Sequence, residues 1–396
     1  MAEQSIQEKK AVKADEAKVL EVSSSPHLQD ESTSRRVMLE VAIGTLPAAM
    51  MAIYLFRGSA VIVLLSCLVA GMGTEWIFNA VRKKTQTILD GSALVTCLIL
   101  GLSLPPTFPW WGCVIGSVVA IGVAKMLFGG LGANIFNPAM VGRAFLMACF
   151  GSMMTTWVVT APDLAEHRDK YEKIAQERKI SVDAVTQPTP LAKLKQAIKN
   201  QKRLQEIDAE IETLKAEAAP AADLAKAEED KNNTITTRNE RLHEVNTNKQ
   251  AIFMGMINGS TGEAPTWLWL IGGLFLLWRR TITYHIPLAV LGAAFVVAAI
   301  AWGLNSEVYP NPLMHLCTGG LMMCAFFIAT DPVSCPLSKR GRVIFGIGVG
   351  ILIMLIRLIG GYPEGVMYAV LLMNSMTPLL DRWTRPTPLG GHVQKG

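Results

Sequence analysis

Long apolar segments constrain the fold of this chain more than any other feature. Runs such as 61–70, 111–128 and 288–304 approach the ~20 residues that an α-helix needs to cross about 30 Å of hydrocarbon. Of the 396 residues, 51% are hydrophobic and only 17% are charged. We therefore predict an all-α, polytopic membrane protein with about ten transmembrane helices. The predicted spans lie near 37–56, 60–81, 88–105, 109–128, 138–160, 251–278 (broken), 284–304, 312–330, 341–359 and 364–381.

The basic residues indicate the topology. They gather at five successive ends of the predicted spans, whereas the short loops on the other side carry almost nothing beyond Arg57. Because cytoplasmic loops are enriched in Lys and Arg, this pattern predicts that both termini are cytoplasmic. The net charge of +5 is then a mark of topology and gives no reason to expect a nucleic-acid partner.

The hydropathy pattern divides the chain into five regions. We expect a cytoplasmic tail over 1–34, a first transmembrane repeat over 35–160, an extracytoplasmic insertion over 161–250, a second transmembrane repeat over 251–382, and a tail over 383–396. Apolar residues between Leu191 and Leu214 recur every three or four positions, which predicts a helix in the insertion, and Pro220 would end it.

The two apolar halves resemble each other. The segment Asp90-Gly-Ser-Ala-Leu-Val-Thr-Cys leads to a glycine pair at 129–130, and Thr318-Gly-Gly-Leu-Met-Met-Cys leads to another at 360–361. Since each half has an odd number of spans, the halves would be inverted five-helix repeats with broken helices. That architecture is also typical of solute channels and transporters, so it leaves a transport function open.

One segment between spans carries unusual polarity for a membrane protein. Residues 129–145 combine glycines with Asn134, Asn137 and an arginine, which must face protein, cofactor or water. The two amides could hydrogen-bond a flavin or ubiquinone headgroup, and glycines would permit close approach of a flat ring. The alternative is a broken-helix packing motif in which the amides cap helix ends.

Four carboxylates at or within the spans are candidates for ion coupling. Asp331, Glu364 and Asp90 lie at span ends, and Glu75 lies inside the second span. An intramembrane carboxylate is a candidate cation ligand or proton carrier, although helix capping or interfacial exposure is the commoner explanation for Asp90 and Asp331. The seven cysteines form no C-x-x-C pair, so we expect no metal or iron–sulfur site, and no catalytic residue stands out.

Several long motifs in one order make the chain resemble the RnfD subunit of the Rnf electron-transport complex. It is more distantly similar to NqrB of the sodium-pumping quinone reductase, and the Ser-Pro-His opening favours the RnfD branch. The matching motifs are Ser-Pro-His at 25–27, Gly-Gly-Leu-Gly-Ala-Asn-Ile-Phe-Asn-Pro-Ala at 129–139, Gly-Ser-Thr-Gly-Glu at 259–263, Leu-Ile-Gly-Gly at 270–273, His-Leu-Cys-Thr-Gly-Gly-Leu-Met at 315–322, Phe-Ile-Ala-Thr-Asp-Pro-Val-Ser at 327–334 and Gly-Gly-Tyr-Pro-Glu-Gly-Val at 360–366.

The resemblance implies a covalent cofactor. In that family FMN is joined by a phosphoester to the last threonine of an Asp-x-x-Ser/Thr-Gly-Ala-Thr signature outside the membrane. The matching positions are Asp183, Thr186 and Thr189, so Thr189 is the implied attachment site. The signature's Gly-Ala is replaced here by Gln187-Pro188, and proline restricts how a flavin transferase could thread this segment.

The resemblance also implies a riboflavin bound noncovalently near Asn134 and Asn137. The chain has no nicotinamide-binding fingerprint, so iron–sulfur and NAD chemistry would belong to partner subunits, along with an extracytoplasmic FMN subunit. We expect a subunit of the cell inner membrane that relays electrons and is inactive alone, coupled to Na⁺ or H⁺ transport. The alternatives are an NqrB-type subunit that reduces quinone, a solute transporter and a structural family member without flavin.

Overall fold

The computed structural model describes residues 33–157, 160, 172, 176, 189–216, 220–247, 260–262, 266–306, 309–362 and 364–385. The predicted terminal tails, except for 33–34 and 383–385, lie outside these residues, as do Asp183, Thr186, Gln187 and Pro188 of the flavin signature. The chain divides into two units, Met1–Ser34 and Arg35–Gly396, and the description below concerns the second.

The first two predicted spans both lie in α2 (Ser34–Val81), which consists of two helices joined at a kink. Arg57 takes a left-handed conformation (φ 51°) and separates two apolar helices, Ser34–Phe56 and Gly58–Val81. Both are long and apolar enough to cross a membrane. A single residue in a non-helical conformation is therefore the whole connection between two spans.

The other predicted spans correspond to single helices or runs of short ones. Two further helices, α13 and α16, are long and apolar enough to span a membrane, and shorter apolar helices accompany them. The described chain contains no β-strand, which confirms the all-α, polytopic prediction. The elements are η1 (Ile88–Asp90), α3 (Ser92–Ser103), α4 (Trp110–Val118), the π-helical η2 (Val119–Met126), α5 (Pro138–Cys149), α6 (Gly151–Met154), α12 (Thr266–Trp278), α13 (His285–Leu304), α14 (Pro312–Cys317), α15 (Leu321–Met323), the π-helical η4 (Cys324–Ile328), α16 (Lys339–Leu358) and α17 (Val366–Trp383).

The sixth and eighth spans are not single uninterrupted helices over their described residues. The described helix of the sixth span begins only at Thr266, and the turn before it bonds to the end of α3 through Thr261 N–H to Leu104 O (3.0 Å). The eighth span is interrupted at Thr318–Gly320, between α14 and α15, where Gly319 has φ +69°. The left-handed backbone therefore falls on a Gly-Gly pair, which carries no Cβ penalty.

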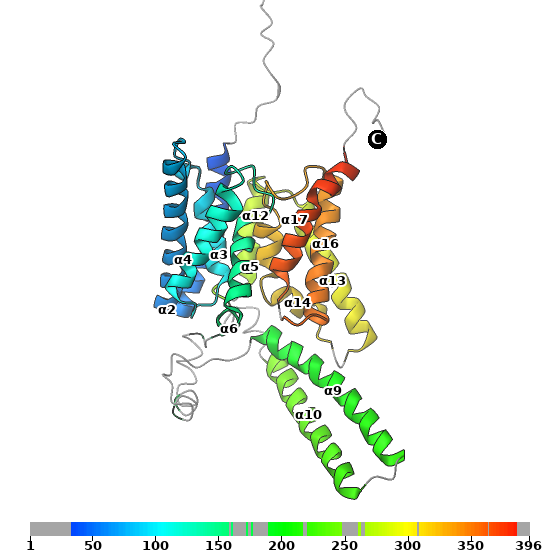
Figure 1. The fold of residues 1–396 in the computed structure, drawn as a ribbon. Helices are drawn as coiled ribbons and strands as arrows, with labels where there is room; N and C mark the ends of the chain where they lie inside the picture. Colours follow the sequence, from blue (N-terminus) through cyan, green and yellow to red (C-terminus); the bar gives the residue numbers. More distant parts are fainter. Residues whose placement is uncertain are drawn as a thin grey trace, which may run out of the picture. The chain divides into compact units, whose positions relative to one another are not determined.

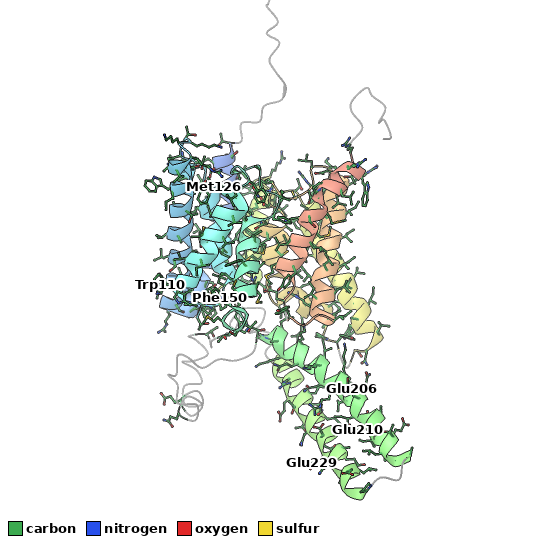
Figure 2. All side chains as sticks on the ribbon, in the orientation of Figure 1. Trp110, Met126, Phe150, Glu206, Glu210 and Glu229 are labelled. Atoms are coloured by element: carbon green, nitrogen blue, oxygen red, sulfur yellow. The ribbon has the colours of Figure 1, made fainter. Side chains whose placement is uncertain are left out.

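The figures show at which end of the bundle several of the helices begin and end. The deep-blue start of α2 and the red end of α17 lie at the same end of the bundle (Figure 1). Figure 2 shows Trp110, at the start of α4, at the opposite end from Met126, at the end of η2. Phe150 lies near Trp110, and its ring meets that of Trp111 edge-on at 5.3 Å. The α4–η2 run and α5 therefore cross the bundle in opposite directions.

The insertion contains a helical hairpin of α9 (Pro190–Ala216) and α10 (Ala221–Thr247). The apolar face predicted from the spacing is buried in α9, and charged side chains such as Glu206, Glu210 and Glu229 project from the pair (Figure 2). Ion pairs join the helices, for example Arg203 to Asp230 at 2.8 Å. Pro220 comes just before α10, in the turn between the two helices.

Candidate functional site

A cavity lies where the start of α2, α3, the loop after η2, and η4 with its following loop meet. Counted with the open solvent at its mouth, its space is about 730 Å³. Apolar side chains such as Val95, Ile99 and Phe326 form most of its wall. The polar lining residues are Ser92, Thr96, Lys125, Asn134, Asn137, Thr281, Thr330 and Asp331.

The two predicted amides both line this cavity, but they are bound differently. Asn137 caps α5 by accepting from Met140 N–H (3.2 Å), and its Nδ2 donates to Ile328 O at the end of η4 (3.3 Å). Asn134 donates through Nδ2 to Phe136 O (3.2 Å), and its Oδ1 makes no hydrogen bond within the described chain. Asn137 therefore fixes the join between the two apolar halves, and Asn134 retains an acceptor that a ligand could use.

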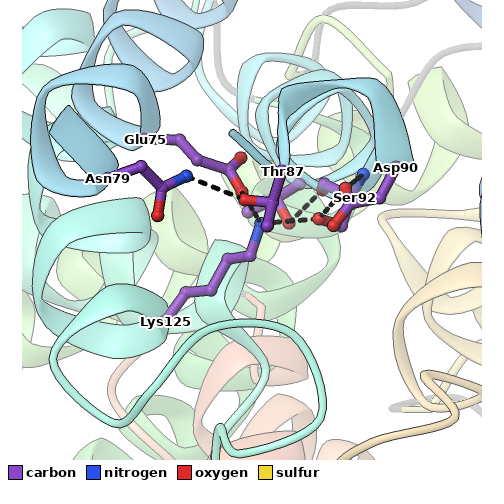
Figure 3. Close-up of polar contacts among 7 residues, drawn as sticks. Glu75, Asn79, Thr87, Asp90, Ser92 and Lys125 are labelled. Carbon is purple, nitrogen blue, oxygen red and sulfur yellow. Dashed lines mark hydrogen bonds and ion pairs between the residues drawn. The ribbon is translucent and has the colours of Figure 1, made fainter. Parts of the chain in front are cut away.

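A buried ion pair adjoins the cavity. Lys125 Nζ, at the end of η2, lies 3.0 Å from Glu75 Oε1 on α2, with side chains 2% and 0% exposed (Figure 3). Lys125 also donates to Ser92 Oγ (2.6 Å), and Thr87 Oγ1 donates to Glu75 Oε1 (2.6 Å). Glu75 Oε2 is buried and has no hydrogen-bond partner in the described chain. Glu75 thus has a cationic partner, which reduces the cost of its position inside a span.

Asp90 and Asp331 make local hydrogen bonds. Asp90 Oδ1 accepts from the backbone N–H of Ser92 (2.7 Å) and from its hydroxyl (2.5 Å). Asp331 accepts from Val333 N–H (3.3 Å) and from Ser334 Oγ (2.9 Å). Such contacts two or three residues along the chain are those of Asx turns, and the N-caps of the next long helices are Gly91 for α3 and Ser338 for α16. Asp90 nonetheless joins the Glu75 network through Ser92, and Asp331 lines the cavity.

Glu364 lies apart from the cavity, at the break in the eighth span. Its Oε2 is 2.7 Å from Arg143 Nη2 of α5, and its Oε1 accepts from Gly320 N–H (2.6 Å). Arg357 of α16 donates to His315 O (2.6 Å) and Thr318 O (2.9 Å), the carbonyls at the end of α14. These contacts satisfy backbone groups that the break in the helix leaves unpaired.

Thr189 is the N-terminal cap of α9. Its Oγ1 accepts from Ala192 N–H at 3.1 Å, and the residue is only 5% exposed. The first turn of α9 meets the bundle at the same break, because Leu191 Cδ2 lies 3.3 Å from the point where a Cβ on Gly319 would stand. Thr189 therefore lies at the positive end of a long helix.

The structure brings together some predicted residues and adds others. Asn134, Asn137 and Asp331 share the cavity, and Glu75 and Asp90 share the network beside it. Lys125 and Arg357 were not predicted as site residues. A usable signal existed, since a single cation inside an apolar span requires a partner, which would have paired Lys125 with one of the intramembrane carboxylates.

These features define an α-helical, polytopic membrane protein with charged pairs buried among apolar helices and a cavity with polar groups in its wall. The chain belongs to the NQR2, RnfD, RnfE family, whose model matches residues 21–390. It is 37% identical over 94% of its length to a subunit of the proton-translocating ferredoxin:NAD(+) oxidoreductase complex of Clostridium ljungdahlii, covering 96% of that protein. It is 34% identical over 94% of its length to the equivalent subunit of the ion-translocating oxidoreductase complex of Yersinia pseudotuberculosis (98% covered), and 35% identical over 93% to that of Shewanella amazonensis (97% covered).

Proposed function

We propose that this chain is the RnfD subunit of an Rnf-type, ion-translocating oxidoreductase complex and that it relays electrons through bound flavin. Relatives that cover nearly the whole chain carry the names of such a subunit. The observation that carries the flavin part is the cavity, whose apolar walls suit a flat ring and whose amide and ammonium groups suit its polar edge.

We assign a noncovalent riboflavin to this cavity. The residues fit such a ring: Asn134 Oδ1 can accept from a ring N–H, and Lys125 can donate to a ring carbonyl or nitrogen. Flavin bound there would supply one-electron chemistry, while the protein excludes water and fixes the ring's orientation. Asn137, which joins α5 to η4, would hold the cavity walls in place.

We assign a second, covalent flavin, FMN, to Thr189. The chemistry fits in one respect, because a phosphoester at this position would lie at the positive end of α9. The burial of Thr189 adds a requirement: the first turn of α9 must leave the bundle for a transferase to reach the hydroxyl, or attachment must precede docking.

The proposed partners, localisation and ion coupling follow from membership of such a complex. Iron–sulfur, NAD-binding and extracytoplasmic FMN subunits would be partners, and a flavin transferase would act on this chain. The protein would lie in the cell inner membrane with both termini cytoplasmic, in agreement with the common end shared by the start of α2 and the end of α17. Glu75, Asp90, Asp331 and Glu364 are the carboxylates proposed for coupling to Na⁺ or H⁺.

Flavin content tests both assignments. The complex is purified after co-expression with a flavin transferase, and flavin is measured in the gel and in the denatured supernatant. Fluorescence on the denatured chain should disappear with Thr189→Val and persist with Thr213→Val, an exposed control on α9. Flavin in the supernatant should fall with Asn134→Leu and remain with Asn233→Leu, an exposed control on α10.

The outcomes separate the rival functions. Wild type without either flavin would contradict the proposal and favour a transporter or a structural subunit. Quinone extracted in place of riboflavin, and lost with Asn134→Leu, would favour an NqrB-type subunit.

A further inference from the structure

The Lys125–Glu75 pair is built in an unusual way for a purely structural contact. Both side chains are almost completely buried, and removing two charges from water costs more than a simple contact returns unless every polar atom is satisfied. Glu75 Oε1 accepts from both Lys125 and Thr87, whereas Oε2 has no partner within the described chain. One oxygen of the pair therefore lacks a hydrogen bond in a buried region, where an unsatisfied polar atom costs free energy.

The pair is also placed to act on whatever fills the cavity. Lys125 and Ser92 both line the cavity, and the two are hydrogen-bonded to each other. An ammonium has three N–H donors, and Glu75 and Ser92 are the two acceptors it has in the described chain. One donor thus remains for a ligand. Glu75 is not among the lining residues, so the carboxylate acts on the cavity from behind the ammonium.

We infer that Lys125 and Glu75 together set the reduction potential of the flavin bound in this cavity. This inference rests on the proposed riboflavin site. Lys125 favours the negative charge that the ring gains when it takes an electron from a reduced flavin, and Glu75 opposes that charge from further away. The electron enters and leaves through the ring, and the two side chains exchange no electron and form no new covalent bond. Burial makes both effects larger than they would be in water.

If the two charges act electrostatically on the ring, removing one or the other should shift the midpoint potential of the flavin in opposite directions. A purely structural role predicts no such opposite shifts. Lys125→Met should lower the midpoint potential of the noncovalent flavin, because the reduced ring loses a cation. Glu75→Gln should raise it, because the ammonium is then no longer offset. The double variant Lys125→Met/Glu75→Gln removes both charges and should lie between the single variants. We expect each single variant to change the relative affinity for reduced and oxidised ring at least tenfold, which is about 59 mV for a one-electron couple.

The experiment is spectroelectrochemical titration of the purified complex, with Lys84→Met as the control for loss of an exposed lysine. Where a variant binds flavin too weakly to titrate, the affinities for added oxidised and reduced riboflavin give the same ratio. Single-variant potentials that are unchanged, or that move in the same direction, would overturn the inference while leaving the flavin site in place. Wild type that releases no noncovalent flavin would instead overturn the cavity assignment, and the inference with it.

Discussion

At the scale of single residues, Lys195 shows how the insertion is held to the bundle. Its Nζ donates to Ile356 O (3.3 Å) near the end of α16 and to Tyr362 O in the loop that follows. Carbonyls at a helix C-terminus lack intrahelical donors, so a lysine there satisfies them. Lys195 lies in the second turn of α9, just beyond Thr189, and it therefore positions the proposed flavin attachment site against the bundle.

This contact should depend on pH. Burial lowers the pKa of Lys195 from its usual 10.5 to about 8. Between those values the unfolded chain holds a proton that the folded chain has released, so stability rises as pH increases through this window. Hydrogen exchange over 191–200, corrected for intrinsic rates, should show greater protection at about pH 9.5 than at about pH 7.5. Lys195→Met should lose this dependence, and the exposed Lys199→Met should retain it. Equal dependence in wild type and Lys195→Met would contradict the assignment.

At the scale of helices, small residues allow α2 and α12 to approach closely. A Cβ built on Gly272 would overlap the carbonyl oxygen of Gly44, far inside contact distance. Gly272→Ala must push the two helices apart, and overpacking of this kind costs typically about 1–3 kcal/mol. A lower midpoint of thermal unfolding in detergent would show it. Gly292→Ala on α13 is the matched control, since nothing lies within 4 Å of its built Cβ, and it should be neutral or slightly stabilising.

The helices could be predicted largely from the sequence, but the contacts that stabilise their interruptions could not. In lipid a segment must satisfy its own backbone hydrogen bonds, so an apolar run of sufficient length already specifies a helix. The interruption at Thr318–Gly320 depends on Arg357 and Glu364, which bind the freed backbone groups from distant parts of the chain. The sixth span was predicted to be broken, and residues 260–262 form a turn before α12.

At the scale of the whole molecule, buried ion pairs connect regions that are far apart in sequence. Lys125 and Glu75 are 50 residues apart, and Arg143 and Glu364 are 221 apart. Apolar periodicity reports only which face of an element is buried, so it identifies a charged residue as unusual without naming its partner. For this reason Glu75 and Glu364 could be predicted as candidates, whereas which cation pairs with which carboxylate required the structure.

The Arg143–Glu364 pair joins α5 of the first half to the segment before α17 in the second, and its side chains are 6% and 13% exposed. Breaking a buried pair from one side leaves an uncompensated charge, which typically costs about 3–5 kcal/mol. Glu364→Ala should therefore lower the thermal midpoint strongly, and Arg143→Met/Glu364→Ala should recover part of the loss because neither charge remains. Ion transport by the reconstituted complex separates this structural role from the proposed coupling role. If Glu364→Gln keeps wild-type stability but abolishes transport, Glu364 acts on the ion. If stability and transport fall together and both return in Arg143→Met/Glu364→Ala, the pair acts by holding the two halves in register.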